Sequence, residues 1–441
     1  MSAPLMHIST DEVPPSSADC VIIGAGIVGV SAAYWLARAG LRVALVEKGA
    51  VGAEQSSRNW GWCRQQNRDA RELPLATKTL ALWEEMAADI GEDLGFRRCG
   101  LLYLSNKPSE LEGWANWGRF ARTAGVDTRM LSAAEAAERG AATGQSWLGG
   151  VWSPTDGIAD PARAAPLIAK GVIKHGGHVV QNCAVRGLEL SAGAVCGVIT
   201  ERGVIATKMV VMAGGAWASS FLHQLGIKFP QASVRSSILS VAPGAKGVPS
   251  ALHTGPVSVT QRGDGGYTLA ISGCGHLDPT PGAVMGAKHF LPMFAKRWRA
   301  LRPGGLQAWR SGFETRAHWA MDQETPMERV RVLDPRPSQA LVDKTLRRAR
   351  RLLPALRDIP VQASWAGYID STPDGVPVID ADVGIGGLIL AAGLSGHGFG
   401  VGPGVGHLVA DLALGRTTIT EVEQYRLARF GESQWGKVAK F

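Results

Sequence analysis

The sequence predicts an α/β protein that combines a Rossmann-type nucleotide-binding domain with a second, mostly antiparallel β-sheet domain. Residues 19–48 read as a strand, a glycine-rich turn, a helix and a second strand, which is the order of a βαβ unit. Residues 230–335 alternate short apolar runs with Gly and Pro turns and contain one helical stretch, which is typical of an antiparallel sheet. In a chain of 441 residues these two patterns favour two interwoven domains.

The first βαβ unit carries a nucleotide-binding motif. An apolar strand at 20–23 leads into Gly24, Gly26 and Gly29 with G-x-G-x-x-G spacing, and a second apolar strand ends on Glu47. The three glycines permit a tight turn, close approach of a pyrophosphate and close packing of helix against strand. Free N–H groups at the start of the helix attract the pyrophosphate. A carboxylate at position 47 accepts hydrogen bonds from ribose hydroxyls and disfavours a 2′-phosphate, so the motif predicts a dinucleotide site.

Periodicity, capping signals and turn residues predict the other elements. Helices are expected at 72–91, 108–126, 132–139, from Asp160-Pro161 to Lys174, near 287–301, at 338–353 and at 404–415. Strands are expected at 100–104, 178–180, 184–190, 195–200, within 203–213 and at 386–393. Residues 1–18 and 421–441 are expected to be tails.

Composition narrows the classes of partner. The net charge of +8 is spread thinly, except for the basic run 344–351, whose apolar side favours a solvated amphipathic helix over a lipid or protein patch. No aromatic-basic RNA motif is present, so no nucleic-acid partner is expected. The six cysteines form no C-x-x-C pair, which suggests a reducing compartment. Because no apolar run approaches the ~20 residues of a membrane span and residues 1–18 lack an apolar signal core, a cytoplasmic location is expected, with peripheral membrane contact left open.

Five segments in order give the chain a family resemblance. They are the glycine motif with Glu47, the Ser56-Ser57 pair, Val211 to Trp217, Thr372 to Ile379, and Gly393 to Phe399. Together they resemble the FAD-dependent D-amino-acid oxidase/dehydrogenase family, which includes glycine oxidase and sarcosine oxidase. The resemblance covers about residues 18–415.

The resemblance implies a glutathione-reductase-like Rossmann FAD-binding domain with an inserted antiparallel-sheet substrate domain. The FAD-binding domain would comprise residues 19–100, 150–229 and 366–420, and the substrate domain residues 101–149 and 230–365. The implied chemistry is hydride transfer from the carbon beside a neutral amine to flavin N5, giving an imine that hydrolyses. A D-amino acid is the favoured substrate, and an N-substituted amino acid or secondary amine is the alternative.

The resemblance also assigns residues to the cofactor. Gly24, Gly26, Ile27, Val28 and Gly29 would hold the pyrophosphate, Glu47 and Lys48 the ribose region, and Ser56 and Ser57 the phosphate and ribityl oxygens. Trp60, Gly61 and Trp62 would pass along the isoalloxazine, and Val185 would contact the adenine. Gly214 and Trp217, from the segment Val211 to Trp217, are also expected to bind the cofactor. Gly396, His397, Gly398, Phe399 and Gly400 would lie at the pyrimidine end. Candidate catalytic residues are His397, Arg64 and Tyr368, and no metal is expected.

The chain also departs from the family pattern. Members with covalent flavin have a cysteine shortly before Thr-Pro-Asp, and here no cysteine follows Cys274, so non-covalent FAD is expected. Glycine-oxidase-like chains place a carboxylate-binding arginine where this chain has Ile369. Sarcosine-oxidase-like chains place a lysine where this chain has Gly400.

Either another group binds the substrate carboxylate, or the substrate is recognised differently. Possible anchors are Arg64, Arg68, Arg235, Arg316 and Tyr368, with Gln65 and Gln66 as weaker polar contacts and Asp370 as a structural residue or a site for a second amine. A nicotinamide dehydrogenase is a remote alternative, because such an enzyme has no need of cofactor contacts from both chain ends. The sequence leaves open whether oxygen, a quinone or another carrier accepts the electrons, and it leaves the oligomeric state open.

Overall fold

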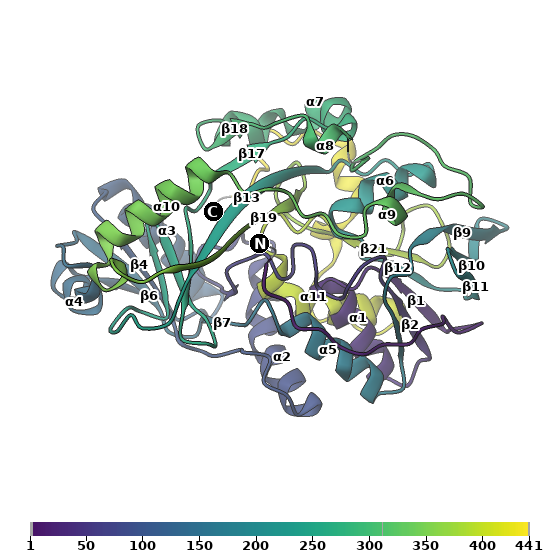
Figure 1. Ribbon diagram of the computed structural model, residues 1–441, viewed down its shortest axis with the longest axis horizontal. Helices are drawn as coiled ribbons and strands as arrows, with labels where there is room; N and C mark the ends of the chain where they lie inside the picture. Colours follow the sequence, from purple (N-terminus) through teal and green to yellow (C-terminus); the bar gives the residue numbers. More distant parts are fainter. Residues whose placement is uncertain (1–2, 311, 440–441) are drawn as a thin grey trace.

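The computed structural model describes residues 3–310 and 312–439, and its two large β-sheets lie side by side along the long axis of the molecule (Figure 1). This arrangement confirms the predicted mixed α/β class. In the first sheet the strand order is β20-β21-β12-β1-β2-β8, and all neighbours are parallel except β20 and β21. The strands of this sheet are β1 (Cys20–Ile23), β2 (Val43–Val46), β8 (His178–Val180), β12 (Val210–Met212), β20 (Val378–Asp380) and β21 (Leu388–Ala392).

Both faces of the first sheet are buried, as expected of a mostly parallel sheet. Cys20 and Ile22 of β1 face one apolar core, whereas Val21 and Ile23 face another. Helices α1 (Ile27–Arg38), α2 (Leu73–Ile90), α5 (Ala164–Lys174) and α11 (Gly398–Ala413) build the first core. The second core contains α6 (Ala218–Gln224) and residues of the three-stranded sheet of β9 (Val185–Ser191), β10 (Ala194–Thr200) and β11 (Gly203–Ala206).

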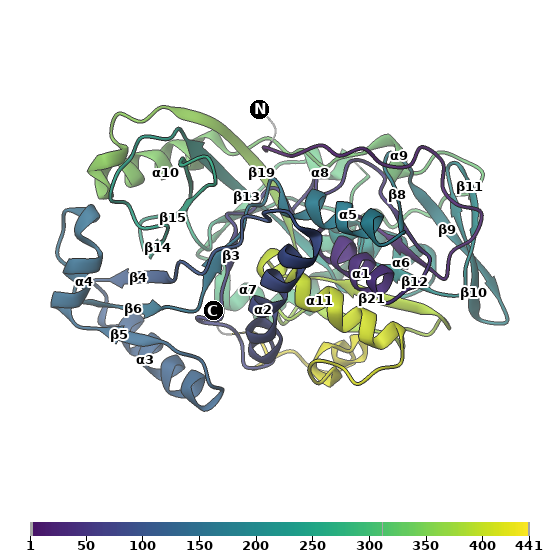
Figure 2. The same cartoon turned by 90° about the horizontal axis from the view of Figure 1, so that it is seen from below.

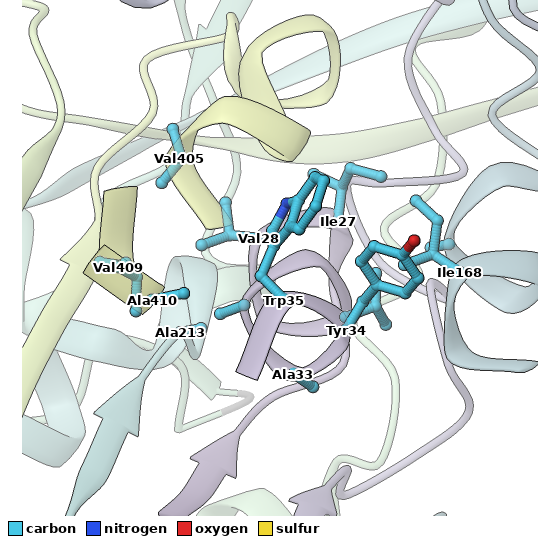
Figure 3. Close-up of a cluster of buried hydrophobic side chains, with 14 of the residues drawn as sticks. Ile27, Val28, Ala33, Tyr34, Trp35, Ile168, Ala213, Val405, Val409 and Ala410 are labelled. Carbon is cyan, nitrogen blue, oxygen red and sulfur yellow. The ribbon is translucent and has the colours of Figure 1, made fainter. Parts of the chain in front are cut away.

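The central helix α1 is apolar on every side because α5, α11 and the strands β1 and β2 cover it. In Figure 3, Val28 of α1 lies between Trp35 of the same helix and Val405 of α11, and Tyr34 is turned toward Ile168 of α5. The Trp35 indole N–H donates to the Pro403 carbonyl at 3.1 Å, so a buried polar group is paired inside this interface.

The second sheet supports the rest of the molecule. Its order is β18-β17-β13-β16-β15-β14-β4-β6-β5, and β19 pairs antiparallel with β13 from Ala232↔Ser371 to Val241↔Val361. Its strands are β4 (Leu101–Ser105), β5 (Arg129–Leu131), β6 (Gly149–Ser153), β13 (Ala232–Val241), β14 (Ala251–Thr254), β15 (Ser258–Gln261), β16 (Tyr267–Ala270), β17 (Gly275–Leu277), β18 (Leu301–Pro303) and β19 (Val361–Ser371).

Helices surround this sheet on several sides. The amphipathic helix α10 (Gln339–Leu352) packs Val342, Ala349 and Leu352 on the β13–β16 part of the sheet, and α3 (Pro108–Thr123) and α4 (Ala133–Arg139) lie at the β4–β6 end (Figure 2). The other elements are β3 (Trp62–Cys63) paired with β7 (Gly157–Ile158), and the helices α7 (Pro281–Arg297), α8 (Gln307–Arg310) and α9 (Pro326–Arg329).

Three predicted helix starts are wrong. The helix expected from Asp160-Pro161 is α5, which begins at Ala164, because residues 161–163 form a turn. The helix expected near 287–301 is α7, which begins at Pro281, because Thr280 caps it by accepting from the Ala283 N–H (3.0 Å) and proline fits the first turn. The helix expected at 404–415 is α11, which begins at Gly398. Glycine is a poor helix former, but the first turns of α11 pack so closely on β3 that a Cβ at Gly400 would lie 2.4 Å from the Trp62 carbonyl oxygen.

The predicted domain boundary at 365/366 falls inside β19, whose full length pairs with β13. The segment expected as an N-terminal tail contacts both neighbouring sheets: Asp11 is bridged to Val180 of β8 in the first sheet, and Ser17 to Ala206 of β11 in the three-stranded sheet. At the other end, the Ala439 N–H donates to the Asp374 carbonyl at 2.8 Å. In residues 3–310 and 312–439, no helix has the length and apolar character needed to cross a membrane, and no cluster of three or more His, Cys, Asp or Glu is arranged to hold a metal ion.

Candidate active site and cofactor cavity

Three adjoining cavities run through the junction of the two sheets. The first has a volume of about 120 Å³, the second about 90 Å³ and the third about 570 Å³. The first and second share Gly26 and Ser56, and the second and third share Gly396 and Phe399. The cavities therefore form one elongated path from the end of β2 to the start of α11. Below they are called the nucleotide cavity, the middle cavity and the large cavity.

The turn between β1 and α1 can be formed only by glycine at two positions. Gly24 has a φ of +98°, and a Cβ there would lie 2.7 Å from the Ala213 carbonyl oxygen. A Cβ on Gly29 would lie 1.8 Å from the Gly24 carbonyl oxygen. The start of α1 is thus held against the turn, and its N-terminal N–H groups, which lack intrahelical acceptors, lie beside the nucleotide and middle cavities.

Glu47 and Lys48 line the nucleotide cavity, together with Val185, Gly214 and Trp217. The Glu47 carboxylate accepts from the N–H groups of Ala25 and Gly49, both at 2.8 Å, and burial raises its pKa. The Lys48 ammonium pairs with Glu54 at 2.6 Å and lies 4.8 Å from the centre of a Trp217 ring. Both charged residues are therefore fixed by the fold at the predicted ribose end.

Ser56 connects the nucleotide cavity to the middle cavity. Its Oγ accepts from the Ile27 N–H at 2.8 Å, and Gly26, Ile27 and Val28 line the middle cavity beside it. The neighbouring Ser57 is buried, and its hydroxyl donates to the Glu54 carbonyl at 3.3 Å. Of the pair, Ser56 is therefore the residue that the structure places at the walls of the cavities.

The large cavity lies between the β13–β19 pair, β3, the start of α11 and α7. Trp60, Trp62 and Arg64 come from the β3 segment, whereas Gly396, His397, Phe399 and Gly400 come from the start of α11. Gly61 between the two tryptophans has a φ of +86°, and a Cβ there would lie 2.4 Å from the Ala159 carbonyl oxygen. The predicted contacts from both chain ends are thus brought together around one cavity.

The structure shows what stands at the positions of the two familiar carboxylate anchors. A Cβ on Gly400 would lie 2.4 Å from the Trp62 carbonyl oxygen, so a lysine cannot occupy this position without displacing β3. Ile369 lines the large cavity, and an atom added at Gly396 would contact it at 3.4 Å. An apolar side chain therefore stands at the position where a guanidinium is found in glycine-oxidase-like chains.

Alternation along β19 separates two of the other candidates from the large cavity. Ile369 and Ser371 face the large cavity, whereas Tyr368 and Asp370 line the nucleotide cavity on the opposite face. The Tyr368 hydroxyl donates to Asp278 at 2.7 Å. The Asp370 carboxylate accepts from the Gly393 N–H at 2.9 Å, and burial raises its pKa to about 6.

The arginine candidates also differ in their surroundings. Arg235 forms a two-point ion pair with Asp278, at 2.8 and 3.1 Å. Arg316 lies beside His223, at 3.5 Å. Arg68 is buried and is not among the described residues that line the large cavity. Arg64 lines this cavity, and its guanidinium donates to the Gln66 carbonyl.

Gln65 and Gln66 belong to a hydrogen-bond network around a buried carboxylate. Their N–H groups donate to Asp156 at 2.7 and 3.1 Å. The Gln66 amide oxygen also accepts from the Thr128 hydroxyl at 2.7 Å. These contacts fix the chain that follows Arg64.

His397 is a neutral residue at the start of α11. Burial, together with the nearby positive charge of Arg68, lowers the pKa of His397 to about 4. Its Nδ1 lies 3.4 Å from a carboxylate oxygen of Glu72. At neutral pH the imidazole therefore offers a dipole and hydrogen-bonding groups to the cavity and no positive charge.

Sequence reasoning missed several residues of the large cavity. The Arg58 guanidinium is buried in its wall and donates to Asp334 at 2.6 Å and to the Ala366 carbonyl at 2.8 Å. Phe290, Met293 and Arg297 line it from α7. Arg58 directly follows the predicted serine pair, which was an available signal, but nothing local indicated that α7 covers this site.

The fold and the connected cavities define a flavin-dependent oxidoreductase with a dinucleotide cofactor. A family model described as FAD-dependent oxidoreductase, DAO, matches residues 19–412, so the chain belongs to this family. FAD is its cofactor, and the protein is an oxidoreductase that acts on an amino acid or amine. The glycine-lined turn, the cavities at the start of α1 and the cavity at the start of α11 fit this elongated cofactor.

Two relatives and one solved structure are similar over nearly the whole chain. Glycine oxidase of Geobacillus kaustophilus is 26% identical, with 93% of this chain and 97% of the relative covered. Sarcosine oxidase subunit beta of Rhizobium meliloti is 25% identical, with 95% and 89% covered. The structure of L-amino acid deaminase from Proteus myxofaciens in complex with anthranilate superposes with a TM-score of 0.93 at 26% identity, with 98% and 97% covered.

Proposed function

We propose that this flavoenzyme oxidises the Cα–N bond of an α-amino acid with a large apolar side chain, and that the substrate has the L configuration. Bound FAD supplies the acceptor for the hydride that leaves Cα. The amine nitrogen loses a proton, and the resulting imino acid hydrolyses to an oxo acid and ammonium. The observation that carries the proposal is the size and apolar lining of the large cavity.

The walls of the large cavity favour an apolar side chain. Ile238, Ile271, Phe290 and Met293 line it, and Ile369 extends the same surface toward α11. Apolar area buried by a ligand contributes about 25 cal/mol per Å², so a leucine or phenylalanine side chain gains binding energy there. Glycine and sarcosine leave these walls in contact with water, which argues against them as preferred substrates.

The charges around the large cavity favour the neutral amine that the reaction needs. Arg58, Arg64 and Arg297 line it, and among residues 3–310 and 312–439 no carboxylate does. Nearby positive charge disfavours a substrate ammonium ion and attracts a carboxylate. We assign the carboxylate to Arg64, because Arg58 is already paired with the Asp334 carboxylate, whereas the hydrogen bond from Arg64 to the neutral Gln66 carbonyl does not compensate its charge.

No residue is needed as a strong general base in this scheme. The neutral imidazole of His397 stands at the start of α11 beside the cavity. Its role is to help hold the substrate in a fixed orientation. The arginines lower the pKa of the bound amine, so deprotonation can precede hydride loss.

The likeness to an L-amino acid deaminase supports the L configuration. The sequence alone favoured a D-amino acid, and an N-substituted amino acid was the alternative. Sequence identity does not separate these possibilities, because glycine oxidase and sarcosine oxidase relatives are equally distant. The enantiomers and N-methyl derivatives of leucine and phenylalanine are therefore the decisive panel.

The experiment is a product assay with purified, FAD-loaded protein. Each amino acid is supplied with air or with a dye acceptor, and the oxo acid and ammonium are both measured. We expect L-leucine and L-phenylalanine to be the best substrates. Preference for the D enantiomers with the same apolar side chains overturns the configuration alone, whereas preference for glycine or sarcosine overturns the proposal. Turnover with dye but slow turnover in air indicates a dehydrogenase.

The FAD is proposed to be non-covalent and the enzyme cytoplasmic. Cys274 lines the large cavity, so it is the thiol to check: acid precipitation must leave colourless protein and yellow supernatant. Cell fractionation tests the location.

A further inference from the structure

One segment of the chain combines exposed apolar side chains with an excess of positive charge. No acidic residue occurs between Asp278 and Glu314, whereas six basic residues do: Lys288, Lys296, Arg297, Arg299, Arg302 and Arg310. This stretch contains α7, β18 and α8, which lie together along the upper edge of the molecule in Figure 1. We call its outward side the α7–α8 surface.

The apolar side chains of the α7–α8 surface are large and far from buried. Between 48% and 66% of the surface of each is exposed in Val284, Met285, Leu291, Trp298, Leu306 and Trp309. Val284, Leu291 and Trp298 recur at seven-residue spacing, so they form one stripe along α7. Exposed patches of this kind mark interaction sites in soluble proteins.

Helix α7 contributes some side chains to the large cavity and exposes others on the surface of the molecule. Phe290 and Met293 line the large cavity, whereas Val284, Lys288 and Trp298 are exposed and are not among the described residues that line it. An outward side with tryptophan, leucine and lysine is typical of helices that lie in the interface of a bilayer. The rim residues Leu291 and Phe294 belong to both sides, since they are exposed and also line the cavity.

We propose that the α7–α8 surface docks onto an anionic lipid bilayer as a peripheral contact, with the apolar stripe entering the headgroup region. This goes beyond the proposed reaction and does not depend on the substrate. Charge complementarity selects the partner, because basic residues close to an anionic membrane surface strengthen binding to it. A second copy is disfavoured, because a symmetric dimer would bring two acid-free basic segments together.

The test is co-sedimentation of the FAD-loaded full chain with vesicles. One set contains phosphatidylcholine with one third phosphatidylglycerol, and the other contains phosphatidylcholine alone. We expect binding to the anionic vesicles that weakens at high salt, and much weaker binding to the neutral ones.

Two triple variants separate the apolar from the charged part. Val284→Ser/Trp298→Ser/Leu306→Ser removes apolar side chains that do not line the large cavity in the described chain, and Lys288→Gln/Arg299→Gln/Arg302→Gln removes exposed charges. Each is expected to lower the partition coefficient at least about tenfold. Flavin absorbance and oxidation of the best amino acid with a soluble dye are expected to match the parent.

Matched controls carry three substitutions of the same kind at exposed positions elsewhere on the molecule. Leu148→Ser/Leu190→Ser/Val204→Ser replaces exposed apolar residues, and Arg119→Gln/Arg122→Gln/Arg416→Gln replaces exposed arginines. Both controls are expected to bind anionic vesicles like the parent. Absence of binding by the parent, or equal binding by the α7–α8 variants, overturns the proposal. A dimer in solution that Trp298→Ser dissociates also overturns it, in favour of a second copy.

Discussion

Replacing Glu314 by glutamine is expected to remove a loss of stability that the parent suffers as the pH rises. The Glu314 carboxylate is buried behind α7 and accepts from the Thr280 hydroxyl. Thr280 in turn caps α7, and the Glu314 carbonyl accepts from the Gly282 N–H at 3.0 Å. The residue thus ties the start of the helix that covers the large cavity to the body of the protein.

The size and sign of the effect follow from the pKa. Burial raises the pKa of Glu314 from its ordinary 4.5 to about 7. Below pH 4.5 both folded and unfolded chains hold the proton, so nothing is lost. Between pH 4.5 and 7 only the folded chain holds it, and stability falls as the pH rises. At about 1.4 kcal/mol per pH unit, the loss reaches roughly 3 kcal/mol above pH 7.

Thermal unfolding of FAD-saturated parent and Glu314→Gln protein from about pH 5 to pH 9 measures this effect. The melting temperature of the variant relative to that of the parent is expected to rise by a few degrees from the low to the high end of this pH range. The exposed α4 residue Glu138, changed to glutamine, is the matched control and should follow the parent. Parallel pH profiles of parent and Glu314→Gln protein would refute the reasoning.

Three further predictions concern the cofactor turn, a buried ion pair and the pH dependence of the reaction. Gly29→Ala is expected to purify without FAD, because its Cβ would lie 1.8 Å from a carbonyl oxygen; the flavin-to-protein absorbance ratio measures this. Gly113→Ala, in open space on α3, should keep FAD and gain about 0.5–1 kcal/mol of stability. Asp278→Ala leaves the Arg235 guanidinium without its carboxylate and should cost about 3–5 kcal/mol, measured by urea unfolding; an unchanged midpoint contradicts the pairing. His397→Asn should leave the pH dependence of flavin reduction between about pH 6 and 9 unchanged, because burial first, and then nearby positive charge, hold the pKa of His397 at about 4; loss of an ionisation in that range would show that the histidine titrates there.

Local signals in the sequence predicted much of the fold. The βαβ unit at 19–48, the helix α2 and the capping box at Ser132 are fixed by residues close in the chain. The pairing of β13 with β19 joins segments more than a hundred residues apart, and no local pattern contains that register. The early start of α11 was missed for the same reason: distant backbone, including the Trp62 carbonyl, excludes a side chain at Gly400.

The candidate site, too, contains residues that local motifs predict and residues that only long-range pairing brings together. The cofactor cradle is built from contiguous motifs, so the glycines, Glu47 and Ser56 were predicted as a group. The walls of the large cavity come from α7, β3 and β19, and which side of β19 faces the cavity depends on its pairing. Tyr368 was therefore a reasonable candidate from sequence, yet its side chain lies on the face of β19 opposite to Ile369.

The most direct test of the central claim is anaerobic reduction of the bound flavin in a stopped-flow spectrophotometer. L-leucine, D-leucine, glycine and sarcosine are mixed separately with parent and Arg64→Gln protein. We expect rapid bleaching by L-leucine at low concentration, slow bleaching by the other three, and a large rise in the L-leucine Kd in the variant. Fast bleaching by glycine or sarcosine with no response to L-leucine would contradict the central claim.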